Sequence, residues 1–259
     1  MSYLPEWRKA LSHFPVIPWN AFIDHVRVNV NPLAADDHMK EVIQQLQLMG
    51  EVIYVKGNVC VDVIVLDPKW LCSTVVGHLL SPDFVGKSRP SGFYTSEELM
   101  NITAWEAVDN ILPILESLGL CAKMDLDNSD LEYEFPCYNG LKAAEGIWTD
   151  KNHDIYGGVV LKSAFGGQTK LLKLMLPRIQ AQLRRQFVVK AEGKTDLFQW
   201  SQGSKYYIGE VEGLLQLNQA GSSLEVRVRG PKNCEKECFF FLEEILGVID
   251  QVLLFRNSM

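Results

Sequence analysis

The chain has 259 residues and a mass of 29.3 kDa; 47% of its residues are hydrophobic and its formal net charge is −7. This composition excludes a disordered, a collagen-like and a low-complexity chain, and the length suffices for one large core or two smaller ones. No apolar run approaches the ~18 residues of a membrane helix. Glu6, Arg8 and Lys9 stand where a signal peptide needs apolar residues. We therefore expect a cytoplasmic protein without a transmembrane segment.

The charge is distributed unevenly along the chain. Residues 1–150 carry 10 basic and 21 acidic side chains, a net charge of −11, whereas residues 151–259 carry 15 and 11, a net charge of +4. This contrast predicts two domains, which we place at residues 1–140 and 141–259. The acidic first half argues against nucleic acid as a partner, because phosphate binding depends on clustered cations.

An internal repeat organises the first half. Residues 37–49 have apolar side chains at helical spacing and end at Gly50; two β-rich runs, 51–55 and 61–66, then predict a hairpin, and Pro68 opens a helix over 70–80. About 68 residues later a helix ends at Gly119, and strands at 120–124 and 131–135 precede Pro136. Such units are typical of tandem winged-helix folds, although two ordinary helix-hairpin segments could resemble each other by chance. Within the first unit we expect Trp70 to be a core residue.

The second half begins after a polar linker at residues 139–154 and is rich in strands. The pattern predicts a short helix from Pro177 to Arg185 and a long final helix over 234–255. At 224–229 the side chains alternate, which predicts a sheet with one solvated face that includes Arg229. The predicted strands cover residues 156–162, 187–190, 197–200, 205–211, 214–217 and 224–229. The fold class is therefore predicted to be α+β.

Each resemblance to a catalytic or ligand-binding motif lacks residues that the motif requires. Gly86, Lys87 and Ser88 imitate the end of a phosphate-binding loop, but Ser81 replaces its first glycine and Pro82 removes a backbone donor. The acidic turn at 125–130 lacks the glycine and glutamate of a calcium loop. The five histidines have no metal-ligand spacing. The six cysteines form no CxxC pair and are expected to be reduced thiols, buried as small apolar groups. We therefore predict no catalytic, cofactor or metal residues, and a chain that is not itself an enzyme.

Two features favour a protein partner. Between residues 156 and 191 there are seven basic side chains and no acid. This excess predicts a face neutralised by acids from elsewhere in the fold, a docking surface for an acidic protein domain, or a surface for anionic lipid or nucleic acid. In addition, Phe239, Phe240 and Phe241 cannot all point into one core, because successive helical residues are ~100° apart. The candidate interface residues are Phe239, Phe240, Lys170, Lys173, Arg178, Arg184 and Arg185.

Several segments together resemble the COR domain, which follows the Ras-like Roc domain in Roco proteins. They are LMGEVI at 48–53, VLDPKWL at 65–71, LGLC at 118–121 and YEFPC at 133–137, with Leu176–Pro177, residues 200–203 and residues 226–230 in the second half. The details most resemble the death-associated protein kinase branch. The resemblance implies a COR-A half of winged-helix-like units and a COR-B half with an antiparallel sheet and a long C-terminal helix.

The resemblance also implies a role. It predicts a regulatory module, excised from a longer Ser/Thr kinase, that docks on a Roc-like GTPase domain of the same protein and can form a homodimer. The alternatives are a tandem winged-helix nucleic-acid binder and a hydrolase with an unrecognised site. The first would need a basic recognition helix, yet residues 70–80 contain no Lys or Arg.

Overall fold

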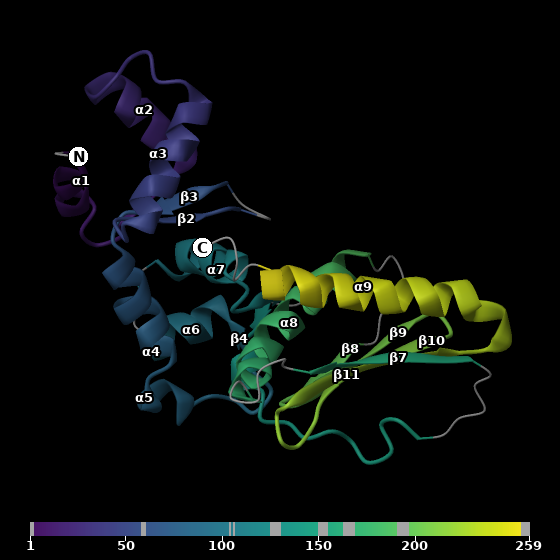
Figure 1. Ribbon diagram of the computed structural model, residues 1–259. Coiled ribbons are helices and arrows are strands. Elements are labelled where there is room, and N and C mark those ends of the chain that lie inside the picture. Colours follow the sequence, from purple (N-terminus) through teal and green to yellow (C-terminus); the bar gives the residue numbers. More distant parts are fainter. Residues whose placement is uncertain are drawn as a thin grey trace. The chain divides into compact units, whose positions relative to one another are not determined.

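The computed structural model describes residues 3–57, 61–103, 105, 107–124, 131–149, 155–162, 169–190 and 197–254. The chain divides into two compact units, the first of Met1–Lys87 and Glu97–Leu118, the second of Ser88–Ser96 and Gly119–Met259. This division differs from the predicted boundary between residues 140 and 141. The two domains proposed from the sequence stay a prediction. Figure 1 gives the element labels used below.

In the first unit, the first three helices share one core with a small three-stranded sheet. α3 (Asp36–Leu48) begins with two acidic residues, which favour a helix N-terminus, and ends before Gly50, whose φ of +73° suits glycine. β2 (Ile53–Val55) and β3 (Val63–Val65) form the predicted antiparallel hairpin, and β1 (Val16–Pro18) pairs with β3. The other helices of this unit are α1 (Tyr3–Ala10), α2 (Trp19–Asn29), α4 (Gly77–Leu79), α5 (Pro82–Val85), α6 (Ser96–Thr103) and α7 (Val108–Ser117).

The helix predicted over residues 70–80 is a π-helix, Trp70–Val76, followed by α4. Its buried residues are Leu71, Val75 and Leu79, whereas Trp70 is only half-buried and packs edge-on against Phe14, with ring centroids 5.5 Å apart. The prediction that Trp70 is a core residue is therefore wrong in degree. The wider π turn places Leu71, rather than Trp70, toward the interior.

The element order of the repeat occurs twice along the chain. β1, α2, α3, β2 and β3 are matched by β4 (Phe93–Thr95), α6, α7, β5 (Ala122–Met124) and β6 (Glu132–Glu134). Both three-stranded sheets have the last strand in the middle, in the orders β1-β3-β2 and β4-β6-β5. Both closing prolines begin helical turns, Pro68 just before the π-helix and Pro136 in η2 (Pro136–Tyr138). The repeat thus extends to sheet topology, and its winged-helix character stays a prediction.

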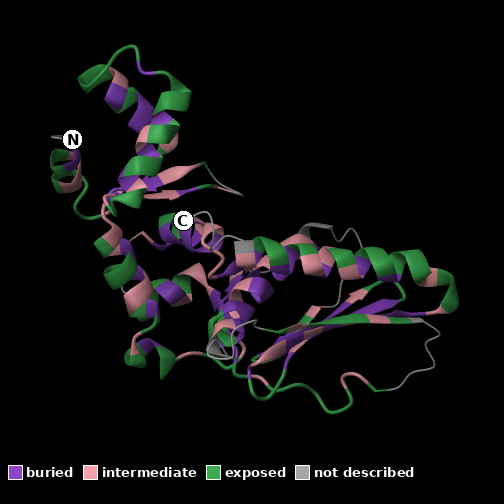
Figure 2. Ribbon diagram, in the orientation of Figure 1, coloured by how far each residue is buried: buried purple, intermediate pink, exposed green. Residues whose placement is uncertain are grey.

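A five-stranded antiparallel sheet dominates the second unit, with strand order β7-β11-β10-β9-β8. Its strands are β7 (Ile155–Lys162), β8 (Leu197–Trp200), β9 (Gly203–Ile208), β10 (Val211–Leu217) and β11 (Ser223–Gly230). Helices α8 (Thr169–Lys190) and α9 (Glu235–Leu254) contribute to one core with the sheet. Figure 2 shows the outer side of α9 exposed along its length. The predicted α+β class, antiparallel sheet and long final helix are confirmed.

Helix α8 corrects two predictions. Pro177 does not begin a short helix but lies inside α8, and the strand predicted at residues 187–190 is the last turn of the same helix. A proline inside a helix costs ~3 kcal/mol. Burial of Leu176, Ile179 and Leu183, each at most 1% exposed, offsets that cost. Phe187 is likewise buried, with its ring 5.3 Å from that of Tyr206.

Candidate functional site

The three consecutive phenylalanines lie in the first half of α9. Phe241 is buried and its ring lies edge-on to Phe187, with centroids 5.5 Å apart. Phe239 and Phe240 are 59% and 64% exposed and contact each other edge-to-face, with centroids 5.8 Å apart. Gly213 of β10 makes room for Phe241, because a Cβ atom at Gly213 would come within 2.6 Å of its ring. The helix therefore fixes one aromatic ring in the core and holds two at the surface.

The basic residues predicted to form an interface differ in exposure. Lys173 is exposed, Arg178 and Arg185 are half-buried, and the side chain of Lys170 lies outside the described part of the chain. Burial lowers the pKa of Arg178, and Arg185 donates a hydrogen bond to the Gln182 side chain. Arg178 and Arg185 are therefore less accessible to a partner than Lys173.

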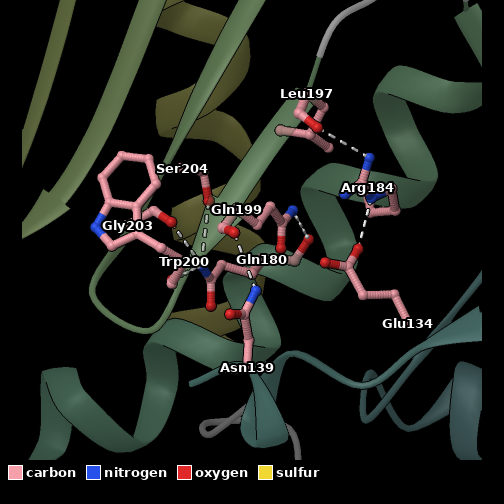
Figure 3. Close-up of polar contacts among 9 residues, drawn as sticks. All are labelled: Glu134, Asn139, Gln180, Arg184, Leu197, Gln199, Trp200, Gly203 and Ser204. Atoms are coloured by element: carbon pink, nitrogen blue, oxygen red, sulfur yellow. Dashed lines mark hydrogen bonds and ion pairs between the residues drawn. The ribbon is translucent and has the colours of Figure 1, made fainter. Parts of the chain in front are cut away.

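Arg184 departs most from the prediction, because it is buried. Its Nε donates to Oε2 of Glu134 in β6 over 2.5 Å, and its Nη1 donates to the Leu197 carbonyl over 3.4 Å (Figure 3). The acid that neutralises this part of the basic stretch thus comes from elsewhere in the fold, which is one of the three alternatives that the sequence left open. A cation held in this way is not available to a partner.

Side-chain amides beside this ion pair tie α8 to the β8-β9 hairpin. Gln180 Nε2 lies within hydrogen-bond distance of the carbonyls of Trp200 and Gly203 and of Ser204 Oγ, at 3.0, 2.9 and 3.2 Å (Figure 3). Gln199 returns a bond from its Nε2 to the Gln180 carbonyl over 3.1 Å. These groups are buried, and their hydrogen bonds hold the helix and hairpin in one register.

Asn139 extends the network to the small sheet. Its Nδ2 donates to the Gln199 carbonyl over 3.0 Å, and its Oδ1 accepts from the Leu141 amide over 3.0 Å. Asn139 directly follows η2, which continues from β6. The small sheet, the linker, α8 and the hairpin are therefore connected by polar contacts within the second unit.

A second buried ionic cluster corrects the prediction that Arg229 is solvated, whereas the side chains of Glu225 and Arg227 on the same predicted face are 33% and 43% exposed. Arg229 is fully buried, and its Nε and Nη2 donate to Glu212 Oε2 over 2.9 and 2.6 Å. Lys205 Nζ lies 3.2 Å from the same oxygen, and the Trp148 ring covers Arg229, with its centroid 4.0 Å from Cζ. The linker supplies that ring, so it packs on the sheet and covers the end of the predicted solvated face at which Arg229 lies.

Sequence reasoning missed Glu134, Glu212 and Trp148 as partners of the basic residues. Glu134 lies in the run Glu132–Glu134, which has the ordinary alternation of a half-exposed strand. No local signal distinguishes its buried carboxylate from the half-buried one of Glu132, because the difference arises from contact with α8.

The remaining sequence motifs have no ligand-binding geometry in the described part of the chain. Residues 82–85, within the imitation of a phosphate loop, form helix α5, whose first turn is capped by Ser81 Oγ. Of the described cysteines, all free thiols, Cys121 and Cys238 are buried as predicted, whereas Cys72 and Cys137 are exposed and Cys234 is half-buried. Cys60 and the acidic turn at 125–130 lie outside the described residues. Among described residues no cluster of three His, Cys, Asp or Glu side chains could hold a metal ion. No described helix is long and apolar enough to cross a bilayer.

Comparison with known proteins identifies what the chain resembles. It is 34% identical, over 96% of its length, to the death-associated protein kinase dapk-1 of Caenorhabditis elegans, and it covers 18% of that protein. It is 24% identical, over 71% of its length, to protein TORNADO 1 of Arabidopsis thaliana, and covers 15% of it. No model of a known protein family matches the chain. The chain thus spans less than a fifth of either relative.

One prediction is contradicted by this comparison. The absence of catalytic motifs favoured a chain that is not an enzyme, yet the relative that it matches over almost its whole length is named a protein kinase. The resemblance to the death-associated protein kinase branch is supported. The chain is homologous to a segment of a death-associated protein kinase.

Proposed function

We propose that this chain is the COR-like regulatory module of a death-associated-protein-kinase-like protein of the cytoplasm. In this proposal, winged-helix-like units form its first part and a COR-B-like half its second. It couples a Roc-like GTP-binding domain of the same protein to the remaining domains, among them the kinase. It also self-associates through its second half. The homology, which covers nearly all of this chain but only 18% of dapk-1, supports a module within a larger protein.

The observation that carries self-association is the exposed pair Phe239 and Phe240. Two adjacent aromatic rings at 59% and 64% exposure place apolar area in water on a helix whose opposite side is packed. Soluble proteins use such exposed apolar area chiefly at interfaces, where aromatic residues are enriched. A two-fold interface needs only one such patch, because each copy presents the same surface.

Sedimentation velocity at tens of micromolar tests self-association. We expect the unaltered chain to sediment as a dimer and Phe240→Glu to sediment as a folded monomer. Leu48→Glu is the control, because Leu48 is 71% exposed on α3 in the other unit and should leave the dimer intact. A monomeric unaltered chain would contradict self-association.

Coupling to the Roc-like domain is tested in the full-length protein. We expect Phe240→Glu to change the GTP hydrolysis rate at least several-fold, whereas Leu48→Glu leaves it unchanged. Equal rates for both variants and the unaltered protein would contradict coupling through this surface.

A further inference from the structure

The edge strand β7 lacks the features that protect sheet edges. It pairs with β11, and among the described strands no other pairs with it. It is eight residues long and contains no proline, and its single charged residue is Lys162 at the end. Sheet edges are ordinarily protected by charges, prolines, bulges or shortness, since an open edge pairs with other chains. The opposite edge, β8, is only four residues long.

The register of β7 against β11 defines its two faces. Gly157 and Val159 lie opposite Val228 and Val226, which are buried in the core under the helices. Tyr156, Gly158 and Val160 therefore lie on the other face, because side chains alternate along a strand. On that face Tyr156 is 56% exposed and Val160 51% exposed.

The strand is complementary to a second copy of itself. A two-fold axis perpendicular to the sheet keeps every side chain on its own face, so an antiparallel pair of β7 strands must be centred on a residue. Centred on Gly158, the pair sets Tyr156 opposite Val160 of the other copy, twice. Aromatic and β-branched side chains pair favourably across strands, and two glycines at the axis leave room for the rings.

The next allowed register is less favourable. Centred on Val159, it would set Tyr156 opposite Lys162 of the other copy and move Val160 opposite Gly158. This register loses the two tyrosine–valine pairs and brings a charged side chain, Lys162, into the paired segment. The chemistry of the strand therefore favours the register centred on Gly158.

Helix α9 adds apolar surface beside the same edge. Leu242 lies near Gly157 of β7, its Cδ2 3.9 Å from where a Cβ atom would stand. Phe239 is three residues before Leu242 and so lies on the same flank of the helix. Its ring is 59% exposed.

We propose that two copies of this chain pair antiparallel along β7, with Gly158 on the two-fold axis and Tyr156 opposite Val160, so that two five-stranded sheets become one. This inference rests on the proposed self-association and adds the β7 edge to the exposed phenylalanines of α9 as a surface of the dimer.

Charged side chains introduced at the paired positions test the register. Tyr156→Lys with Val160→Lys places two lysines opposite each other on both sides of the axis, and we expect the dimer dissociation constant to rise at least 100-fold. Tyr156→Lys with Val160→Glu differs at one residue and sets a lysine opposite a glutamate, so it should restore the dimer to within about tenfold. Both positions are exposed, and urea unfolding should confirm that both variants fold.

The outcomes separate this inference from the proposed function. In the register centred on Val159, the lysine introduced at position 156 would face Lys162 of the other copy in both variants, and neither would dimerise, which overturns the proposed register. A dimer that Phe240→Glu disrupts but both β7 variants retain overturns pairing along β7 while self-association stands. A monomeric unaltered chain overturns both.

Discussion

Arg184 in α8 and Glu134 in β6 form a buried ion pair, in which Nε lies 2.5 Å from Oε2 and the side chains are 7% and 0% exposed. The second carboxylate oxygen, Oε1, is buried without a hydrogen-bond partner among the described groups. The pair joins the small sheet of the second unit to the helix that packs on the large sheet. Loss of either member would leave a charge buried and uncompensated.

Arg184→Met should therefore destabilise the chain by about 3–5 kcal/mol, the usual loss when one partner of a buried pair is removed. Urea unfolding measures this change. Arg27→Met is the control, because Arg27 and Asp36 form an exposed pair at 2.6 Å, and its loss should cost at most about 1 kcal/mol. Comparable losses in the two variants would show that Arg184 is solvated.

Two glycines give opposite predictions for the same substitution. Gly213→Ala places a methyl group within 2.6 Å of the Phe241 ring and should cost about 1–3 kcal/mol through overpacking. Gly247 lies exposed inside α9 with no atom within 4 Å of a new Cβ atom, so Gly247→Ala should stabilise the helix by up to about 1 kcal/mol. Thermal melting of both variants checks the two signs, and a destabilised Gly247→Ala would argue against the helix.

Leu71, not Trp70, should dominate the stability of the π-helix region. Leu71 is 3% exposed, so Leu71→Ala should cost about 2–5 kcal/mol. Trp70 is half-buried and should cost only about 1–2 kcal/mol when replaced by Ala. The order of the two losses in chemical denaturation is decisive, and the reverse order would restore the expectation from sequence.

Tyr54 makes stability depend on alkaline pH. Burial, a hydrogen bond to Asp62 and the charge of that carboxylate raise the pKa of Tyr54 to about 12. Because the folded pKa lies above the unfolded value of about 10, the stabilisation is complete below pH 10 and is lost as the pH rises toward 12. Tyr54→Phe should remove this part of the pH dependence. Melting temperatures of both chains from about pH 9 to about pH 11.5 give the comparison, and parallel curves would contradict the prediction.

The sequence alone determined the features that depend on neighbours along the chain. Helical spacing placed α3, α7 and α9, and Gly50 and Gly119, at φ of +73° and +71°, mark the ends of helices because glycine has no Cβ to clash there. The run of three phenylalanines also predicted that at least one ring lies outside the core, because the rotation of ~100° per residue is a local property of a helix. The resemblance to the death-associated protein kinases came from the same local segments.

Tertiary structure decided what depends on partners distant in sequence. Strands β1 and β4 are three residues long and carry too little periodicity to be predicted, since they exist through pairing with β3 and β6. Helix α8 continues through Pro177 because its flanking side chains are buried. Arg184 and Arg229 are buried because they form ion pairs with Glu134 and Glu212 inside the fold. Charge and alternation indicate which side chains are compatible with solvent. Whether such a side chain is exposed is decided by the long-range contacts of the fold.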